Sequence, residues 1–497
     1  MPMEDFSRFC ALANEGNFIP LYRELLADLE TPVSSWVRVC HQRRYSFLLE
    51  SIEGGERIGR YSFLGADPLW TLVHRGGRSE QRFRTGEVKT HSGDPWQTLQ
   101  NCLADYQPVP LPELPPALGG LFGFWGYELV QWIEPRVPVY SDPDGLPDGM
   151  WMQVDQLLVF DQVKRKLWAV VWVDTREGDL HPVFDKGHAR LDHLVDQLRS
   201  PLVESWPVLD WQGSAERPTF TSNLTQAEFE QGVRKAQEYI LAGDIFQVVL
   251  SQRLHVPYPQ DPFTLYRALR VINPSPFMAF FNFGDFQIIG SSPEIMVKLE
   301  HKEGHARATV RPIAGTRRRG KTPAEDNALA ADLLADPKEC AEHVMLIDLG
   351  RNDLGRVCQW GTVQTDELMT VECYSHVMHI VSNVFGELTP DKNAWDLLKA
   401  CFPAGTVSGA PKIRAMEIIH ELEPTRRGPY SGAYGYYSFD GQLNTAITIR
   451  TMVLHQGILS VQAGAGIVAD SVPALEYEET LNKARALLEA LRYSPGL

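Results

Sequence analysis

The chain has 497 residues, of which 44% are hydrophobic and 22% charged, with a formal net charge of -16. This composition is typical of a soluble globular protein long enough for two domains, and it excludes collagenous and low-complexity chains. The negative charge argues against a general binder of nucleic acid or anionic membranes, which needs a basic surface, and no apolar run of about 20 residues predicts a membrane span.

Residues 1–215 are typical of a first α+β domain. Strand-like apolar runs occur at Tyr45–Glu50, Leu157–Phe160 and Leu167–Val173. The segment Arg199–Thr219 contains several Pro and Trp residues and predicts a connection between domains. We therefore expect a second domain over residues 216–497.

The second half begins with a helix predicted over Ala227–Leu241, capped by Thr225 and ended by Gly243. Short apolar runs then predict strands at Phe246–Leu254, Phe277–Asn282, Gln287–Ile289 and Ile295–Leu299, followed by a late hairpin of Thr445–Val453 and Ile458–Gln462. Further helices are predicted at Asp326–Leu334, Lys338–Leu349, Ala394–Ala400, Pro411–Leu422 and Leu475–Leu491.

The segment Cys401–Arg414, CFPAGTVSGAPKIR, has the residue types of an anion site. Gly405 and Gly409 allow close backbone approach, Pro411 suits the first helical position, and Lys412 adds a cation. By itself it could equally be a tight loop that caps a helix. Its spacing does not match a P-loop, and the GAGIVA run at 464–469 lacks the βαβ context of a dinucleotide site.

Several charged side chains could serve a metal or a carboxylate. Glu342 and Glu479 lie on two predicted helices and would suit Mg²⁺ if those helices converge, although surface salt bridges are the ordinary alternative. Arg450 ends an apolar strand and could offer its planar fork to a carboxylate, or form a structural salt bridge. His379 lies in an apolar segment, where a hydrogen-bonded core histidine is the usual explanation.

The seven cysteines are scattered and never in CxxC spacing, which favours reduced thiols over disulfides or zinc. The N-terminal residues are acidic and contain no hydrophobic run of the kind found in signal peptides. We therefore expect a cytoplasmic protein.

Four motifs together resemble the chorismate-utilising enzymes: PIAGTRRRG (312–320), AEHVMLIDLGRNDLGRV (341–357), PAGTVSGAPK (403–412) and QAGAGIVADSVP (462–473). The resemblance covers nearly all of residues 220–490. Within the family the chain is similar to the large subunits of anthranilate synthases, and LLESIEGGERIGRYSFLG (48–65) agrees. The resemblance implies an α+β fold of large antiparallel β-sheets flanked by helices. It also implies a lyase of tryptophan biosynthesis that converts chorismate and ammonia to anthranilate and pyruvate.

Three details carry the assignment within the family. Ala314 stands where aminodeoxychorismate synthases typically have a lysine that can attack the substrate. Gln247 stands where the water-using isochorismate and salicylate synthases have a basic lysine. The LLES and NPSPFM segments resemble those that bind feedback tryptophan. The alternatives are an aminodeoxychorismate, aminodeoxyisochorismate or isochorismate synthase and, in another class, a non-catalytic tryptophan sensor.

The resemblance also implies a role for each site residue. Mg²⁺ would be held by Glu342 and Glu479. Glu294 would be the general acid for departure of the ring hydroxyl, His379 would assist pyruvate elimination, and Thr406 would lie where ammonia meets the substrate. Substrate contacts would come from Gln247, Gly315, Thr316, Lys412, Tyr430, Arg450, Gly464, Ala465 and Gly466.

Partners are implied in the same way. The sequence has no recognisable glutaminase motif, so ammonia would come from a separate glutamine amidotransferase subunit, in a heterotetramer of two large and two small subunits. L-Tryptophan would inhibit allosterically by binding near Ser51, Pro274, Ser275 and Pro276.

Overall fold

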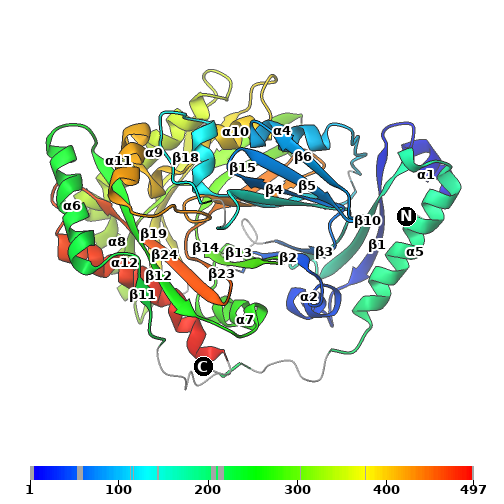
Figure 1. Cartoon of the computed structure of the whole chain (residues 1–497), viewed down its shortest axis with the longest axis horizontal. Helices are drawn as coiled ribbons and strands as arrows, with labels where there is room; N and C mark the ends of the chain where they lie inside the picture. Colours follow the sequence, from blue (N-terminus) through cyan, green and yellow to red (C-terminus); the bar gives the residue numbers. More distant parts are fainter. Residues whose placement is uncertain are drawn as a thin grey trace.

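The computed structural model describes residues 5–52, 60–111, 113–115, 117–142, 145–202, 209–210, 218–302, 304–374 and 377–494. In these ranges the strands form two sheets of twelve strands each, and every ladder between named strands is antiparallel. The sheets lie against each other and helices cover their outer sides (Figure 1). The expected class, large antiparallel sheets flanked by helices, is confirmed.

Strands of the first sheet follow each other in the order β1, β10, β9, β3, β2, β13, β14, β23, β24, β12 and β11, with β20 also paired to β12. Their bounds are β1 Phe18–Leu26, β10 Lys166–Asp174, β9 Gln156–Asp161, β3 Tyr61–Ala66, β2 Tyr45–Glu50, β13 Phe277–Phe283, β14 Phe286–Ser292, β23 Thr451–His455, β24 Ile458–Ile467, β12 Gln247–Pro257, β11 Thr221–Ser222 and β20 Gly409–Ala410.

In the second sheet the order is β17, β19, β16, β15, β22, β21, β7, β8, β4, β5 and β6, with β18 also paired to β19. Their bounds are β17 Ile313–Arg318, β19 Val377–Glu387, β16 His305–Val310, β15 Ile295–Lys302, β22 Leu443–Ile447, β21 Ala433–Ser438, β7 Gly120–Trp125, β8 Gly149–Val154, β4 Trp70–Arg75, β5 Arg78–Phe83, β6 Val88–Ser92 and β18 Gln364–Cys373.

Both sheets contain strands from each half of the sequence. β2 pairs with β13 in the first sheet, and β7 pairs with β21 in the second. The two expected domains therefore share both of their sheets. The boundary expected after residue 215 lies outside the described residues and stays a prediction.

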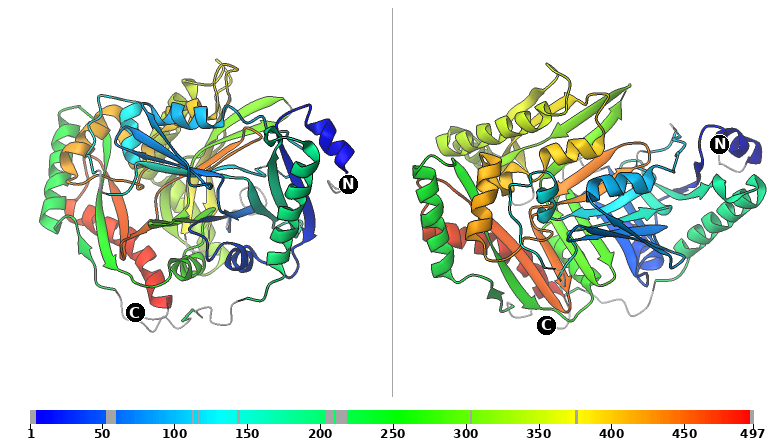
Figure 2. Two further views of the ribbon diagram at one scale, coloured as in Figure 1. Left: turned by 45° about the vertical axis from the view of Figure 1, so that its right-hand side comes forward. Right: turned by 45° about the horizontal axis from the view of Figure 1, so that its top comes forward.

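The helices divide between the two sheets and the two ends of the molecule. α5 packs on β10 and β1 at one end, and α6 and α12 pack on β12 and β24 at the other (Figures 1 and 2). α9 packs on β17 and β19 of the second sheet. The bounds are α1 Phe6–Leu12, α2 Pro32–Val39, α4 Pro95–Leu103, α5 Leu180–Leu198, α6 Gln226–Leu241, α7 Pro262–Ile272, α8 Pro323–Ala335, α9 Pro337–Gly355, α10 Ala394–Cys401, α11 Lys412–Leu422 and α12 Pro473–Leu488.

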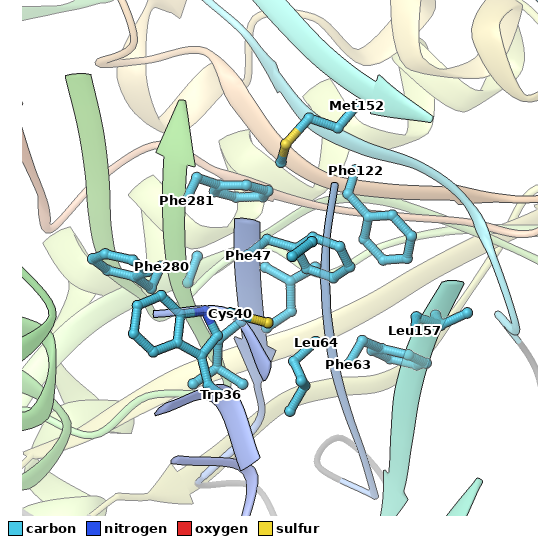
Figure 3. Close-up of a cluster of buried hydrophobic side chains, with 14 of the residues drawn as sticks. Trp36, Cys40, Phe47, Phe63, Leu64, Phe122, Met152, Leu157, Phe280 and Phe281 are labelled. Atoms are coloured by element: carbon cyan, nitrogen blue, oxygen red, sulfur yellow. The ribbon is translucent and has the colours of Figure 1, made fainter. Parts of the chain in front are cut away.

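Aromatic side chains fill the space between the sheets (Figure 3). Phe47 of the first sheet stacks on Phe122 of the second with ring centroids 4.0 Å apart, and both are buried. Trp36 of α2 stacks on Phe263 of α7 at 3.7 Å, which joins the two halves of the sequence again. This continuous apolar core holds the sheets in a fixed relation, so residues at the crossings between them are positioned rigidly.

Most predicted elements are confirmed and one strand is wrong. α6 has the predicted Thr225 cap, strengthened by Glu228 in a capping box. The predicted strand Thr445–Val453 is two strands, because the chain leaves the second sheet after β22 and enters the first at β23. Pro411 is the N-cap of α11 rather than its first helical residue. All seven cysteines are free, and no described helix is long and apolar enough to cross a membrane.

Candidate active site

A cavity of about 210 Å³ opens where the chain passes between the sheets. Glu294 lies in the crossing from β14 to β15, and Arg450 lies in the crossing from β22 to β23. Both side chains line the cavity, together with Gln247, Ala314, Thr316, Glu342, His379, Thr406, Tyr430 and Gly464. The structure thus brings together residues from nine segments that the sequence separates.

Glu294 is buried, with 7% of its surface exposed. Burial raises the pKa of its carboxyl to about 8, and the nearby Thr406, the Ile313 backbone and the Arg450 charge offset only part of that increase. The charged form is disfavoured because a carboxylate loses hydration in the cavity wall. The side chain is therefore mainly a protonated acid at neutral pH.

Arg450 supplies a cation to the same cavity. Its backbone has φ +47°, a left-handed conformation that directs the chain from one sheet to the other. Burial lowers the pKa of its guanidinium, which the charge of Glu294 partly offsets. The side chain has no ion pair within 4 Å among the described residues, so its planar fork is free to bind a carboxylate.

His379 faces the cavity from β19. Its Nδ1 lies 2.8 Å from the carbonyl oxygen of Gly315 and 3.2 Å from Thr316 Oγ1. A carbonyl oxygen only accepts, so Nδ1 carries the hydrogen and Nε2 is left as an acceptor. Burial lowers the pKa of this imidazole, with the charge of Arg450 adding to the effect. The ring is therefore neutral at pH 7.

Thr406 lies in a short 3-10 turn, Gly405–Val407. Its hydroxyl is buried and has no hydrogen-bond partner within 3.5 Å among the described residues. Gly405 is required for packing, because a Cβ there would lie 2.0 Å from Leu349 Cδ2 of α9. Gly409 is required for the same reason, because a Cβ there would lie 2.2 Å from the Gln247 carbonyl oxygen. These glycines hold the loop close to α9 and β12.

Lys412 does not line the cavity. Its Nζ donates to Asp353 Oδ2 at 2.8 Å, and both side chains are about nine-tenths buried. The Lys412–Asp353 ion pair therefore joins α11 to α9 beneath the loop. The role of Lys412 in substrate binding has no support from its position.

The glycines of β24 leave room for two polar side chains. A Cβ on Gly464 would lie 2.7 Å from the Tyr430 hydroxyl, and one on Gly466 would lie 2.4 Å from Gln247 Nε2. Ala465 points the other way, into the apolar core. From Gln462 onward β24 pairs with β12 but not with β23 in the described structure, which leaves one backbone edge of β24 without a strand partner.

Acidic side chains gather at the α9 and α12 side of the cavity. Glu342 lines it and accepts from Gln247 Nε2 at 3.2 Å, whereas Glu479 is half-exposed and pairs with Lys483 at 2.7 Å. Burial, reinforced by the charge of Glu342, raises the pKa of Glu339, and burial also raises that of Glu476, to which Glu479 contributes.

This concentration of hard oxygen ligands fits a divalent cation. Among the described residues no three Asp, Glu, His or Cys side chains converge as a complete metal site. Mg²⁺ would therefore need substrate oxygens and water to complete its coordination, which is usual for this ion.

Two functional groups escaped the sequence analysis. Lys483 lines the cavity and donates to the Gly464 carbonyl at 2.9 Å. Its spacing of four residues from Glu479 was the available signal. Arg427 and Glu423 form a buried ion pair behind the cavity wall, which no motif of the sequence predicts.

A second cavity, of about 390 Å³, lies between β2, β3 and β13 of the first sheet and β15, β21 and β22 of the second. Ser51 and Pro276 line it, while Pro274 and Ser275 lie beside it, and the Ser275 carbonyl accepts from the Ile52 amide at 3.3 Å. The Ser51 hydroxyl is buried without a hydrogen-bond partner in the described residues. Part of the 48–65 motif, residues 53–59, lies outside them.

Comparison with known proteins agrees with this geometry. The family model described as chorismate binding enzyme matches residues 45–489. Anthranilate synthase component 1 of Synechocystis sp. is 62% identical, with 98% of each chain covered, and that of Pseudomonas putida is 49% identical over 99% of this chain and 98% of its own.

Solved structures are similar as well. The crystal structure of anthranilate synthase component I from Streptococcus pneumoniae is 38% identical, covers 93% of this chain and 99% of its own, and has a TM-score of 0.77. The Escherichia coli isochorismate synthase MenF, 19% identical with a TM-score of 0.69 over 98% of each chain, shares the fold.

Proposed function

The chain belongs to the chorismate binding enzyme family, and from this premise we propose that it is the synthase component of an anthranilate synthase. It converts chorismate and ammonia to anthranilate and pyruvate, a step in tryptophan biosynthesis. The single observation that carries the proposal is the meeting of a protonated Glu294 and an unpaired Arg450 in one cavity. This pair suits a substrate that carries both a carboxylate and a poor leaving group.

Glu294 acts as the general acid. A ring hydroxyl leaves readily only when it receives a proton, and a carboxylic acid with a pKa of about 8 holds that proton at neutral pH. Arg450 and the Tyr430 hydroxyl bind the enolpyruvyl carboxylate. Thr406, beside Glu294, is placed to contact ammonia or the departing hydroxyl.

His379 serves the second half of the reaction. Loss of pyruvate aromatises the ring and requires removal of a ring proton. The neutral imidazole keeps Nδ1 bound to the Gly315 carbonyl and leaves Nε2 able to accept a hydrogen bond or a proton. We propose that His379 either accepts this ring proton as a base or orients the substrate for its removal.

We propose Mg²⁺ as the cofactor, held by Glu342 and Glu479. When bound, the metal neutralises the ring carboxylate of chorismate and the surrounding carboxylates. Support comes from the positions of the two side chains: Glu342 lines the cavity, and Glu479 pairs with Lys483, which lines it as well.

Ammonia is the favoured nucleophile. Ala314 and Gln247 both line the cavity, where a lysine would be needed for amine attack or for water activation. The one lysine of the described lining, Lys483, is bound to Glu479 and to the Gly464 carbonyl. An aminodeoxychorismate, aminodeoxyisochorismate or isochorismate synthase is the alternative function, and the identity of the product distinguishes them.

We propose that ammonia comes from a glutamine amidotransferase subunit in a cytoplasmic heterotetramer of two large and two small subunits. The free cysteines suit a reducing compartment.

We also propose that L-tryptophan inhibits by binding the cavity at Ser51. Tyr434 lines that cavity, and its hydroxyl accepts from the Ser292 amide at 3.2 Å, two residues before Glu294. A ligand that moves Tyr434 can therefore displace the catalytic acid, and it would favour whichever arrangement it binds more tightly.

The test is turnover by the purified chain. With chorismate, Mg²⁺ and an ammonium salt it should form anthranilate and pyruvate, identified by fluorescence and mass, and with glutamine alone it should form none. Addition of a component II subunit should restore glutamine-dependent activity. Formation of isochorismate, or of an aminated product that retains its enolpyruvyl group, would contradict the proposal.

A further inference from the structure

A third cavity, of about 300 Å³, lies behind the wall of the active site. Tyr430 and Gln462 line both this cavity and the active-site cavity, so these two side chains form the partition. The remaining walls come from β12, β23, β24, the 426–430 loop, Thr448 and, among the described residues, Asp142, Gly145 and Leu146. We call it the Arg253 cavity, after the β12 residue that decides its charge.

Three arginines line the Arg253 cavity, and two are neutralised. Arg426 pairs with Asp148 at 2.6 Å, and Arg427 pairs with Glu423 at 2.6 Å. Arg253 has no carboxylate within 4 Å among the described residues. Its Nε donates to Gln462 Oε1 at 3.0 Å, and its Nη2 donates to the carbonyl oxygens of Arg426 and Arg427, the latter at 3.2 Å.

The surroundings of Arg253 leave its charge without a close counter-ion. The only carboxylate in the described lining, Asp142, is exposed to solvent, which screens it. Burial lowers the pKa of Arg253, and the charges of Glu128 and Glu423, which pair with Arg426 and Arg427, offset only part of this. Burial and the Arg253 charge lower the pKa of the neighbouring His255. A largely buried guanidinium in this state is stabilised by a carboxylate ligand, which it binds through parallel hydrogen bonds.

The size and polarity of the walls favour a small organic acid. Val453 and Ile458 supply apolar surface, and Thr451 and His455 supply polar groups. Cavities of this size commonly combine apolar walls with a few polar groups that fix the ligand.

We propose that the Arg253 cavity binds a small carboxylate, and that this is the pyruvate released in the active site. The inference rests on the proposed function, in which the enolpyruvyl carboxylate lies at Tyr430 and Arg450. Pyruvate is therefore released beside the partition, and Gln462, which contacts Arg253, links the two sites. The cavity gives the leaving acid a second site and keeps it from rebinding next to anthranilate.

The test measures [¹³C]pyruvate binding by NMR in the absence of chorismate. The Arg450→Gln variant removes the active-site guanidinium, and it should still bind pyruvate. Arg450→Gln/Arg253→Gln should bind at least tenfold more weakly, whereas Arg450→Gln/Arg253→Lys should retain part of the affinity. Arg234→Gln, which changes an exposed arginine of α6, should have no effect.

Three results would overturn the inference. One is pyruvate binding that Arg450→Gln abolishes and Arg253→Gln leaves unchanged. Another is equal affinity for inorganic phosphate, which would remove the carboxylate assignment. The third is unchanged binding in a folded Arg253→Gln protein, with the fold checked by circular dichroism. Failure to make anthranilate from chorismate would contradict the proposed function separately, because the binding measurement involves no turnover.

Discussion

Buried charges are arranged in opposite ways in the active-site cavity and in the cluster directly behind it, which is formed by Arg427 and Glu423 and is called the Arg427 cluster below. In the cavity, Glu294 and Arg450 lack an ion pair with each other within 4 Å. In the cluster, Arg427 is 2% exposed and donates to both carboxylate oxygens of Glu423, at 2.6 and 2.8 Å. It also donates to the carbonyl oxygens of Val407 and Val249, at 2.7 and 2.8 Å.

The difference separates scaffold from binding surface. Burial lowers the pKa of Arg427, but the charge and hydrogen bonds of Glu423 more than offset this and raise it above its ordinary value. Because Val249, Val407 and Tyr430 line the cavity, the Arg427 cluster fixes the wall from behind. Charges that are matched hold the geometry, and charges left unmatched are available to a substrate.

The sharpest test of the cavity is Glu294→Gln. Removing a general acid should lower ammonia-dependent anthranilate formation by about a thousandfold. The melting temperature at neutral pH should be no lower than that of the parent, because glutamine removes the free-energy cost of protonating a buried carboxyl above its ordinary pKa. Steady-state kinetics and thermal melting measure the two effects. Activity within about tenfold of the parent enzyme would remove Glu294 from the chemistry.

The Arg427 cluster should respond in the reverse manner. Arg427→Met leaves Glu423 buried without its partner, and we expect a loss of about 3–5 kcal/mol of folding free energy. The double variant Arg427→Met/Glu423→Met removes both charges and should recover most of it. Denaturant unfolding measures the difference. A single variant as stable as the double one would mean that the pair is not a matched unit.

Glu342 tests the acidic side of the cavity. Glu342→Gln replaces a charged ligand by a neutral one, so the Mg²⁺ concentration for half-maximal activity should rise at least about tenfold. Glu479→Gln should act in the same direction. Glu478→Gln is the matched control on the same helix, because Glu478 lies 3.7 Å from Arg485 at the surface. Equal Mg²⁺ dependence in all three variants would contradict the assignment.

The pH dependence follows from the raised pKa of Glu294. The acid works only when protonated, so the rate at constant free ammonia should fall about tenfold per pH unit above about 8. The folded protein also binds this proton more tightly than the unfolded chain does. Stability should therefore decrease as pH rises from the ordinary carboxyl pKa of about 4.5 to about 8. A profile without a descending limb near pH 8 would contradict the role of Glu294.

The smallest effect on basal activity is expected at Ser51. This residue lines the 390 Å³ cavity, and its hydroxyl, like the charges of the active site, has no partner among the described residues. Ser51→Phe should fill that cavity and relieve tryptophan inhibition, while activity without tryptophan changes by less than about twofold, because surface and cavity-filling changes away from the chemistry are tolerated. Ser92→Phe, at an exposed end of β6, is the control. Full tryptophan sensitivity in Ser51→Phe would place the regulatory site elsewhere.

Local structure was largely predictable from the sequence. β2 has the predicted bounds, and α6 begins after the predicted Thr225 cap, because apolar alternation and capping hydrogen bonds depend on neighbouring residues. The predicted strand Thr445–Val453 failed because an apolar run looks the same whether it stays in one sheet or passes to another.

The sequence by itself determined which residue types to expect in the site, since the resemblance to the chorismate-utilising enzymes already implied Glu294, His379 and Arg450, and all three line the cavity. Tertiary structure alone decided their states. Burial sets the pKa of Glu294, packing brings Gly464 and Gly466 close to Tyr430 and Gln247, and pairing with Asp353 takes Lys412 away from the cavity. Hydration, counter-ions and free space depend on neighbours distant in the chain, and no local pattern of residues encodes them.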